Sequence, residues 1–409
     1  MQRDTDGSGS IRSLGRRLLR FVVAIGVIIA SLSGQTPSAI AAECGDWILV
    51  DGEADFVPAY ADTHAQYWLW SFARTRLSMT TTFRLTGQFP HARYMSFQTY
   101  GATQGDALQD FEILPDAGSV NPFQPGMDRD AAPRAYTVWF VPPTSARDQN
   151  RIEMPSDTFA PNLVLRLVRA DQDKPAGGVP LPTIEAFDDR TGQPVPCPPR
   201  GLPVGLFEDP RDMSQIPLPE DPISFYRVSG ADLIPNAVSA YLLARLANPD
   251  EGTLTLLGFT LPSFPDTYDQ PDTPLMGHED VRYMALCVHG LVSTLTSECL
   301  ADDELQLKQD SQGFVTVVVG PEVSTVRAVA QARGHHYLSW QELAAPLLIY
   351  RQILPRAGFA GSVERVPVFD PGVDRAAQRA ELFMGTYAPT GVVCKVSTFL
   401  ENASACGLP

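Results

Sequence analysis

The hydrophobic residues of this chain fall into short runs separated by prolines and glycines. These runs are rich in β-branched and aromatic residues and cover 82–85, 94–100, 136–141, 163–168, 253–257, 314–319 and 347–351. Runs of this length, bounded by turn residues, are typical of strands in antiparallel sheets. The pattern therefore predicts a mainly β fold with some helix (α+β), built as a β-sandwich.

Other segments have a helical pattern. Asp62 is placed to cap a helix over 62–77, whose aromatic and aliphatic residues cover a wide face. A corresponding helix is expected to begin near Pro235 and to reach Leu246, since proline is tolerated in a first turn. Two more helices are predicted over 323–333 and 374–383, because a glycine follows each shortly after its end. These helices should lie at the periphery of the sheets.

The chain also repeats itself. The segment Arg93-Tyr94-Met95 recurs as Arg282-Tyr283-Met284, and the segment around Arg166 recurs around Arg351. Further similar segments flank these in the same order, and an insertion over 263–279 accounts for the main change in spacing. Similar segments that recur in the same order at a nearly constant spacing predict a duplicated domain. We therefore expect two tandem, jelly-roll-like β-sandwich domains with peripheral helices.

Composition suggests where these domains begin and end. Residues 194–222 are rich in proline, which is typical of a stiff, extended linker. The predicted first repeat is then 44–193 and the second is 223–409. Residues 1–42 have the order of a secretory signal peptide: basic residues, the apolar run 21–30, and small residues at 38–42. The alternative is that this segment is retained as an anchor.

All six cysteines lie after the predicted cleavage site. An even number of cysteines in an exported chain predicts disulfides. Proximity in the sequence favours Cys287 with Cys299 and Cys394 with Cys406, which leaves Cys44 for Cys197. The expected location is periplasmic or extracellular, and the mature chain should not insert in a membrane.

The overall composition narrows the class of protein. The chain has 44% hydrophobic residues, 36 prolines and a net charge of −16. Prolines at this density argue against a helical bundle. An acidic protein repels phosphate backbones, so nucleic acid is not an expected partner.

The repeated segments carry a resemblance. Residues 92–97, 114–123 and 177–182, together with 281–287, 350–355 and 384–394, resemble a family of exported bacterial proteins with no assigned function. The chain is also similar, more loosely, to bacterial tandem domain-of-unknown-function pairs built as β-sandwiches. The resemblance implies a fold and an export route, and it implies no catalytic residues.

Few residues suggest chemistry directly. The chain has no G-x-S-x-G, H-E-x-x-H, Walker or G-x-G-x-x-G motif. No cofactor is expected, with one alternative. An acidic segment could supply oxygen ligands to calcium, and its carboxylates are Asp106, Asp110, Glu112 and Asp116. The interpretation we favour for this segment is a solvated turn or a structural network of aspartate and asparagine side chains.

The repeated arginines are the main candidate site residues. Arginines on strands usually pair with carboxylates inside the fold, and this is the interpretation we favour for Arg93, Arg282, Arg166 and Arg351. The functional alternative is that they line equivalent pockets for an anionic or polar ligand, together with Tyr94 and Tyr283. His278, in the insertion, is a further candidate. The adjacent His335 and His336 are candidate ligands for zinc or copper, but a turn is the interpretation we favour for them, because neighbouring side chains on a strand point to opposite faces.

These observations predict an exported protein of unknown activity that binds a small-molecule or carbohydrate ligand of the envelope or the environment. One alternative is a periplasmic hydrolase or lyase acting on a polysaccharide or small polar substrate. Such an enzyme should use one repeat asymmetrically, and the insertion is the candidate asymmetric element. The other alternative is a structural component of the envelope. The ligand and the oligomeric state are left open by the sequence.

Overall fold

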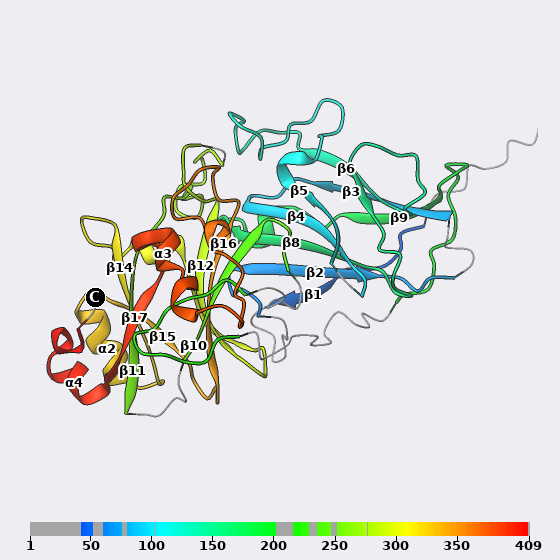
Figure 1. The fold of residues 1–409 in the computed structure, drawn as a ribbon. Coiled ribbons are helices and arrows are strands. Elements are labelled where there is room, and N and C mark those ends of the chain that lie inside the picture. Colours follow the sequence, from blue (N-terminus) through cyan, green and yellow to red (C-terminus); the bar gives the residue numbers. More distant parts are fainter. Residues whose placement is uncertain are drawn as a thin grey trace, which may run out of the picture. The chain divides into compact units, whose positions relative to one another are not determined.

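The computed structural model describes residues 42–51, 60–75, 80–102, 104–201, 216–228, 235–246, 252–275 and 277–407. The predicted signal peptide therefore lies almost wholly outside the described residues. Four β-sheets make up most of the structure (Figure 1). Two sheets belong to the first half of the chain, residues 42–201, and two belong to the second half, residues 216–407.

The first half is a sandwich of two sheets. One has the order β1 (Ile48–Asp51), β2 (Ala65–Ser71), β8 (Asn162–Ala170), β4 (Ala92–Tyr100), β5 (Gln104–Gln109). The other has the order β7 (Arg151–Glu153), β6 (Ala135–Val141), β3 (Thr81–Gln88), β9 (Thr183–Asp188). Apolar residues from both sheets form one buried cluster, which includes Trp70, Phe83, Phe97 and Phe140. The predicted mainly β fold is confirmed.

The second half is also a sandwich. Its first sheet has the order β10 (Ser239–Arg245), β16 (Pro346–Ile353), β12 (Tyr283–Gly290), β13 (Thr296–Ala301). Its second has the order β15 (His336–Ser339), β14 (Phe314–Gly320), β11 (Thr253–Thr260), β17 (Thr390–Lys395). A cluster that includes Leu242, Phe259, Leu286 and Val317 fills the space between them.

Strand order is the same in the two halves. When β10 is matched to β2, β11 to β3, and so on in chain order up to β17 and β9, each pair of neighbouring strands in the second half has a counterpart in the first. The first half has one additional strand, β1. Almost all pairs are antiparallel, and the parallel pairs occupy corresponding places, β6 with β7 and β14 with β15. The outer faces of the two first sheets meet in a further buried cluster that includes Tyr94, Val168, Tyr283 and Ala285. We call this contact between the halves the junction.

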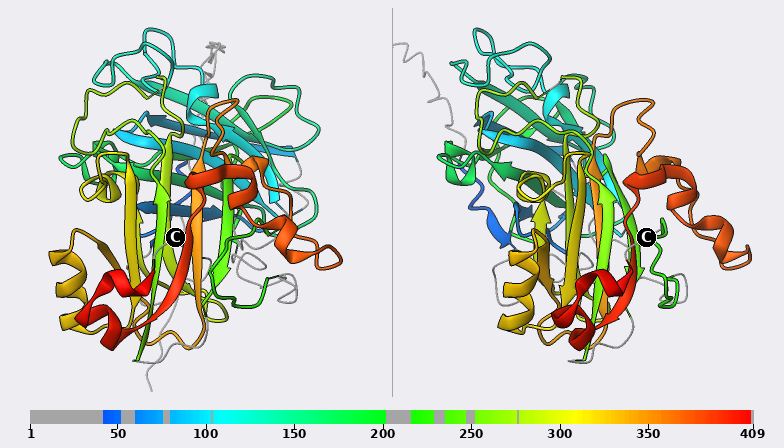
Figure 2. Two further views of the ribbon diagram at one scale, coloured as in Figure 1. Left: turned by 60° about the vertical axis from the view of Figure 1, so that its left-hand side comes forward. Right: turned by 90° about the vertical axis from the view of Figure 1, so that its left-hand side faces the viewer.

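Short helices lie beside the sheets of the second half. They are α1 (Asp302–Gln306), α2 (Ser324–Ala332), α3 (Glu381–Met384) and α4 (Val396–Glu401). The 3-10 turns are η2 (Asp110–Glu112), η3 (Pro175–Gly178), η5 (Val363–Arg365), η6 (Arg375–Gln378), η7 (Gly385–Tyr387) and η8 (Ala403–Cys406). Figure 2 shows α2 and α4 together, and both bury residues in one cluster.

Two of the predicted helices are wrong, and two are found wholly or in part. The segments 62–77 and 235–246 contain strands, β2 and β10. Consecutive residues on both faces of each strand are buried, so its apolar residues are nearly continuous and imitate a broad helical face. The helix predicted over 323–333 is confirmed as α2, and Gly334 follows it with a φ of +75°. The segment 374–383 forms η6 and then α3.

The three predicted disulfides are confirmed. Cys44 bonds Cys197, Cys287 bonds Cys299 across β12 and β13, and Cys394 bonds Cys406. Each bond stays within one half of the chain. Three disulfides are typical of proteins in an oxidising compartment. Among the described residues, no helix is long and apolar enough to cross a membrane.

Parts of the predicted linker pair with the halves. Pro194 bridges to Phe187 and Arg200 to Phe72, so these residues lie on the first half. Ile223, directly after the linker, bridges to Gly391 of the second half. Residues 202–215 of the predicted linker lie outside the described residues.

Candidate functional site

The second half contains a hollow of about 840 Å³ at the edge of its sandwich. It opens between β13 and the segments that follow β14 and β15. We call it the second hollow, and its lining residues are Glu298, Pro321, Glu322, Val323, Arg327, Trp340, Gln341, Glu342, Leu343 and Ala344. A volume of this size is within the range of small-molecule binding sites.

Arg327 is the charged centre of the second hollow. It projects from α2, and its Nη2 donates to Glu298 Oε1 and to Glu322 Oε2, both at 2.7 Å. Its guanidinium also lies over the Tyr337 ring, 4.7 Å from the centroid. A planar guanidinium with two carboxylates and an aromatic ring is held in one orientation.

The backbone around the second hollow is fixed by the sheets. Glu298 alternates on β13 with Cys299, so the cysteine points into the junction and the carboxylate points toward the hollow. The other carboxylate oxygen of Glu298 accepts a hydrogen bond from Ser339 N at 2.7 Å. Trp340 is buried, and its backbone N–H donates to Gly320 O at 3.0 Å. The next residue, Gln341, has a φ of +47°, which is uncommon outside glycine.

The charged residues of the second hollow favour a ligand that carries positive charge. The hydrogen bond from Arg327 lowers the pKa of the Glu322 carboxyl group. The lining holds one guanidinium, that of Arg327, and three carboxylates, those of Glu298, Glu322 and Glu342. An acidic hollow of this kind suits a neutral or cationic ligand with several hydrogen-bonding groups and repels an anionic one.

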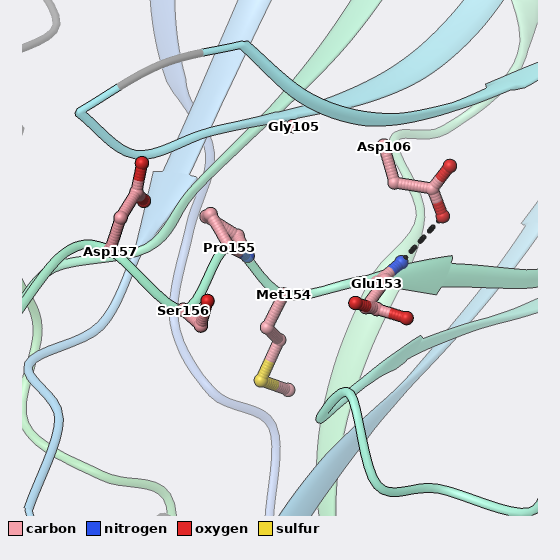
Figure 3. Close-up of a pocket in the computed structure, with 7 residues that line it drawn as sticks. All are labelled: Gly105, Asp106, Glu153, Met154, Pro155, Ser156 and Asp157. Carbon is pink, nitrogen blue, oxygen red and sulfur yellow. Dashed lines mark hydrogen bonds between the residues drawn. The ribbon is translucent and has the colours of Figure 1, made fainter.

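A smaller hollow of about 450 Å³ occupies the corresponding place in the first half (Figure 3). It is lined by Gly105, Asp106, Glu153, Met154, Pro155, Ser156 and Asp157. Asp106 on β5 accepts a hydrogen bond from Glu153 N at 2.9 Å, as Glu298 on β13 does from Ser339 N. Met154 is buried at the position that Trp340 has in the second half. Among the residues that the structure describes, the lining of this first hollow includes no arginine.

The repeated arginines lie elsewhere, inside the junction. Arg93 pairs with Asp302, and its Nη2 lies 3.3 Å from Asp303 Oδ1. Arg282 pairs with Asp110, with 2.7 Å between Nη1 and Oδ1. The side chains of both arginines are almost fully buried, so they pair with carboxylates inside the fold.

The other predicted ligand-binding residues also lie in the junction. Tyr283 donates its hydroxyl proton to Asp62 Oδ2 at 2.9 Å, and Tyr94 is hydrogen-bonded to Asn236 Oδ1 at 3.0 Å. Arg351 lies 3.6 Å from the Asp62 carboxylate. Arg166 donates to Gln98 Oε1 at 3.0 Å and also contacts the Tyr100 hydroxyl. None of these residues lines the two hollows.

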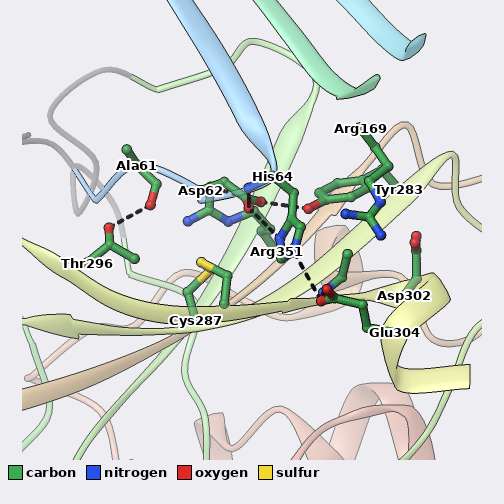
Figure 4. Close-up of polar contacts among 12 residues, drawn as sticks. Ala61, Asp62, His64, Arg169, Tyr283, Cys287, Thr296, Asp302, Glu304 and Arg351 are labelled. Carbon is green, nitrogen blue, oxygen red and sulfur yellow. Dashed lines mark hydrogen bonds and ion pairs between the residues drawn. A yellow bond between two sulfur atoms is a disulfide. The ribbon is translucent and has the colours of Figure 1, made fainter. Parts of the chain in front are cut away.

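His64 is a junction residue that sequence reasoning missed (Figure 4). Its Nε2 lies 3.0 Å from Glu304 Oε2 and its Nδ1 lies 3.3 Å from Asp62 Oδ1. Burial lowers the imidazole pKa, but hydrogen bonds and charge from both carboxylates outweigh it and raise the pKa to about 9. The histidine is therefore a cation at neutral pH. A lone histidine in a turn carries no sequence signal for this role.

The carboxylates considered for calcium have separate partners. Asp110 pairs with Arg282, Asp106 accepts from Glu153 N, Glu112 from Gln109 N, and Asp116 from Thr137 Oγ1. Among the described residues, the ligand atoms that do converge belong to Asp62, Cys287 and Cys299, and the two sulfur atoms are bonded to each other. Calcium at the acidic segment stays a prediction.

The insertion over 263–279 lies against the first half. Leu275 is buried in the first half's core, and the ring centroid of Tyr268 lies 3.7 Å from Arg169 Cζ. His278 is exposed. Of the adjacent histidines, His336 is buried on β15 with Nε2 2.9 Å from Leu305 O, and His335 precedes the strand.

No family model and no curated protein matches the chain. Among solved structures, an uncharacterized protein from Burkholderia cenocepacia is similar over 83% of this chain and 79% of that chain. The identity is 13% and the TM-score is 0.49. A likeness of this degree transfers no function.

Proposed function

We propose that this chain is an exported protein, built from two tandem copies of one β-sandwich domain, that binds a small polar ligand in the second hollow. The ligand class that fits is a neutral or cationic carbohydrate, with amino sugars the best match. The jelly-roll-like connectivity expected from the sequence stays a prediction.

Support for the duplication comes from topology. The two halves have the same strand order in both sheets and the same position for the parallel pair. The repeated Arg-Tyr-Met segments lie at the start of matching strands, β4 and β12. Support for export comes from the three disulfides and from the signal-like residues 1–42.

The observation that carries the ligand proposal is the arrangement around Arg327. Two carboxylates share one guanidinium group, and Gln341 and Glu342 add further hydrogen-bonding groups beside the buried Trp340. Sugar hydroxyl groups both donate and accept hydrogen bonds, so carboxylates and a guanidinium group side by side suit them. An ammonium group on the sugar would gain charge-assisted hydrogen bonds to the carboxylates.

Isothermal titration with glucosamine, chitobiose and galacturonate tests this proposal. We expect glucosamine and chitobiose to bind, and galacturonate to bind at least tenfold more weakly because its carboxylate meets an acidic site. Glu298→Gln should weaken glucosamine binding about tenfold or more, through loss of a charge-assisted contact.

Asp106→Asn, at the corresponding position of the first hollow, is the matched control and should leave glucosamine binding unchanged. Stronger binding of galacturonate than of glucosamine, or equal effects of the two variants, would contradict the proposal. The hydrolase alternative is separated by product analysis, since turnover of chitobiose would show it directly. Failure of all three sugars to bind would favour a structural component.

A further inference from the structure

The junction between the halves contains the same ion pair twice. Arg93 of the first half pairs with Asp302 of the second, and Arg282 of the second half pairs with Asp110 of the first. Each aspartate also accepts a hydrogen bond at 2.8 Å from a strand of its own half, Asp110 from Met95 N and Asp302 from Met284 N. Reciprocal contacts of this kind are the mark of a twofold interface between two copies of one domain.

Neighbouring contacts follow the same reciprocal rule. Gln109 N donates to Glu112 in the first half, and Ala301 N donates to Glu304 in the second, at 2.8 and 2.9 Å. These matching turns align Asp110 with Asp302, and therefore Phe111 with Asp303.

One break in this reciprocity lies at Asp303. Asp303 forms an ion pair with Arg169 of the first half, and both side chains are buried. The position that matches Asp303 is Phe111, and the position that matches Arg169 is Leu354. Arg169 and Leu354 each lie three residues after a repeated arginine, and both have a positive φ, 51° and 49°. One side of the junction therefore has a charged pair where the other side has two apolar residues.

From this break, and resting on the proposed duplication, we infer that the junction is a selective docking surface whose only fitting partner is the other half of the chain. Two first halves in this arrangement would bury Arg169 beside Phe111. Two second halves would bury Asp303 beside Leu354. In the first case Arg169 would have no counter-charge, and in the second Asp302 and Asp303 would share one arginine, the counterpart of Arg93. Buried charges that are not fully paired are destabilising, so both like pairings are disfavoured. The mixed pairing alone matches charge with charge and apolar with apolar residues.

The experiment uses the full chain with a specific protease site inserted at 202–215. Cleavage leaves the halves held by noncovalent contacts alone, those of the junction and of the insertion over 263–279, because each of the three disulfides lies within one half. We expect the cleaved halves to co-elute on size exclusion without reductant, and native mass spectrometry to show mixed pairs only. Arg169→Leu or Asp303→Leu alone should raise the dissociation constant of the halves about 100-fold.

The double variant R169L/D303L is the sharpest test of the inference. It makes the charged side resemble the Phe111 and Leu354 side, so the dissociation constant should return to within about tenfold of the wild-type value. Like pairs of halves should also appear by native mass spectrometry after mild denaturation and refolding. The control is R84L/E185L, an ion pair within the first half, which should leave the dissociation of the halves unchanged.

Three results would overturn the inference. The wild-type halves could separate on cleavage, the double variant could be as weak as either single variant, or like pairs could form equally in wild type. Titration of the intact variants with glucosamine is scored separately, so failure of the ligand proposal is distinguishable from failure of this one.

Discussion

Burial and hydrogen bonding act in opposite directions on His64. Burial lowers the pKa of its imidazole, and Asp62 and Glu304 together raise it, with a net value of about 9. An unfolded histidine has a pKa near 6.5, so the folded state binds the proton more tightly. The resulting stability is fully present below pH 6.5 and is lost as the pH rises through 9.

Replacing His64 should remove this pH dependence. We expect the unfolding free energy of the wild type to fall by roughly 2–3 kcal/mol between pH 6.5 and pH 9.5, and that of His64→Gln to change much less. Urea unfolding followed by circular dichroism at several pH values measures both. The exposed His278 provides the control, since His278→Gln should behave as wild type. Equal slopes for wild type and His64→Gln would show that the histidine is not the group responsible.

Among the secondary-structure elements, those with simple patterns could be predicted from the sequence. Strands such as β4 and β14 are short apolar runs between turn residues, and α2 ends at a glycine. The strands β2 and β10 could not, because burial on both faces removes the alternation that distinguishes a strand from a helix. These two segments are strands because of their tertiary contacts, and no local sequence pattern indicates it.

The candidate site was harder to predict than the fold. Glu298, Arg327 and Trp340 come from a strand, a helix and a loop, and they have no characteristic spacing in the sequence. Only the packing of β13 against the segment after β15 brings them together. By contrast, the repeated arginines gave a sequence signal because the reciprocal ion pairs of the junction need the same residue in both halves.

The disulfides should differ in their effect on stability. Cys44 and Cys197 are 153 residues apart, whereas Cys287 and Cys299 are 12 apart. In the chain-entropy account, the longer loop restricts the unfolded chain more, so C44S/C197S should cost about 5 kcal/mol and C287S/C299S about 3 kcal/mol. Urea unfolding of the two double variants tests the order. A larger loss for C287S/C299S would indicate that contacts in the junction, rather than chain entropy, dominate.

At the scale of the whole molecule, the insertion over 263–279 joins the halves. Leu275 belongs to the second half by sequence, and it is 6% exposed within the core of the first half. Leu275→Ala should therefore lower the unfolding free energy by about 2–4 kcal/mol, through lost burial and the cavity that remains. Leu307→Ala, at a leucine that is 76% exposed, should change it by less than about 0.5 kcal/mol. Similar effects of the two variants would place Leu275 outside the core.

The junction contacts join residues that are far apart in the sequence, and this affects the order in which the two halves can fold and meet. Arg93 meets a partner 209 residues further along the chain, and Asp110 meets one 172 residues further along. During synthesis from the N-terminus, the first half emerges and can fold before either partner exists. The side of the junction that belongs to the first half carries arginines and an aspartate and is therefore not wholly apolar. Exposed apolar patches are the surfaces that promote aggregation. A folded first half that has not yet met the second therefore exposes less apolar surface at a charged junction than it would at a wholly apolar one.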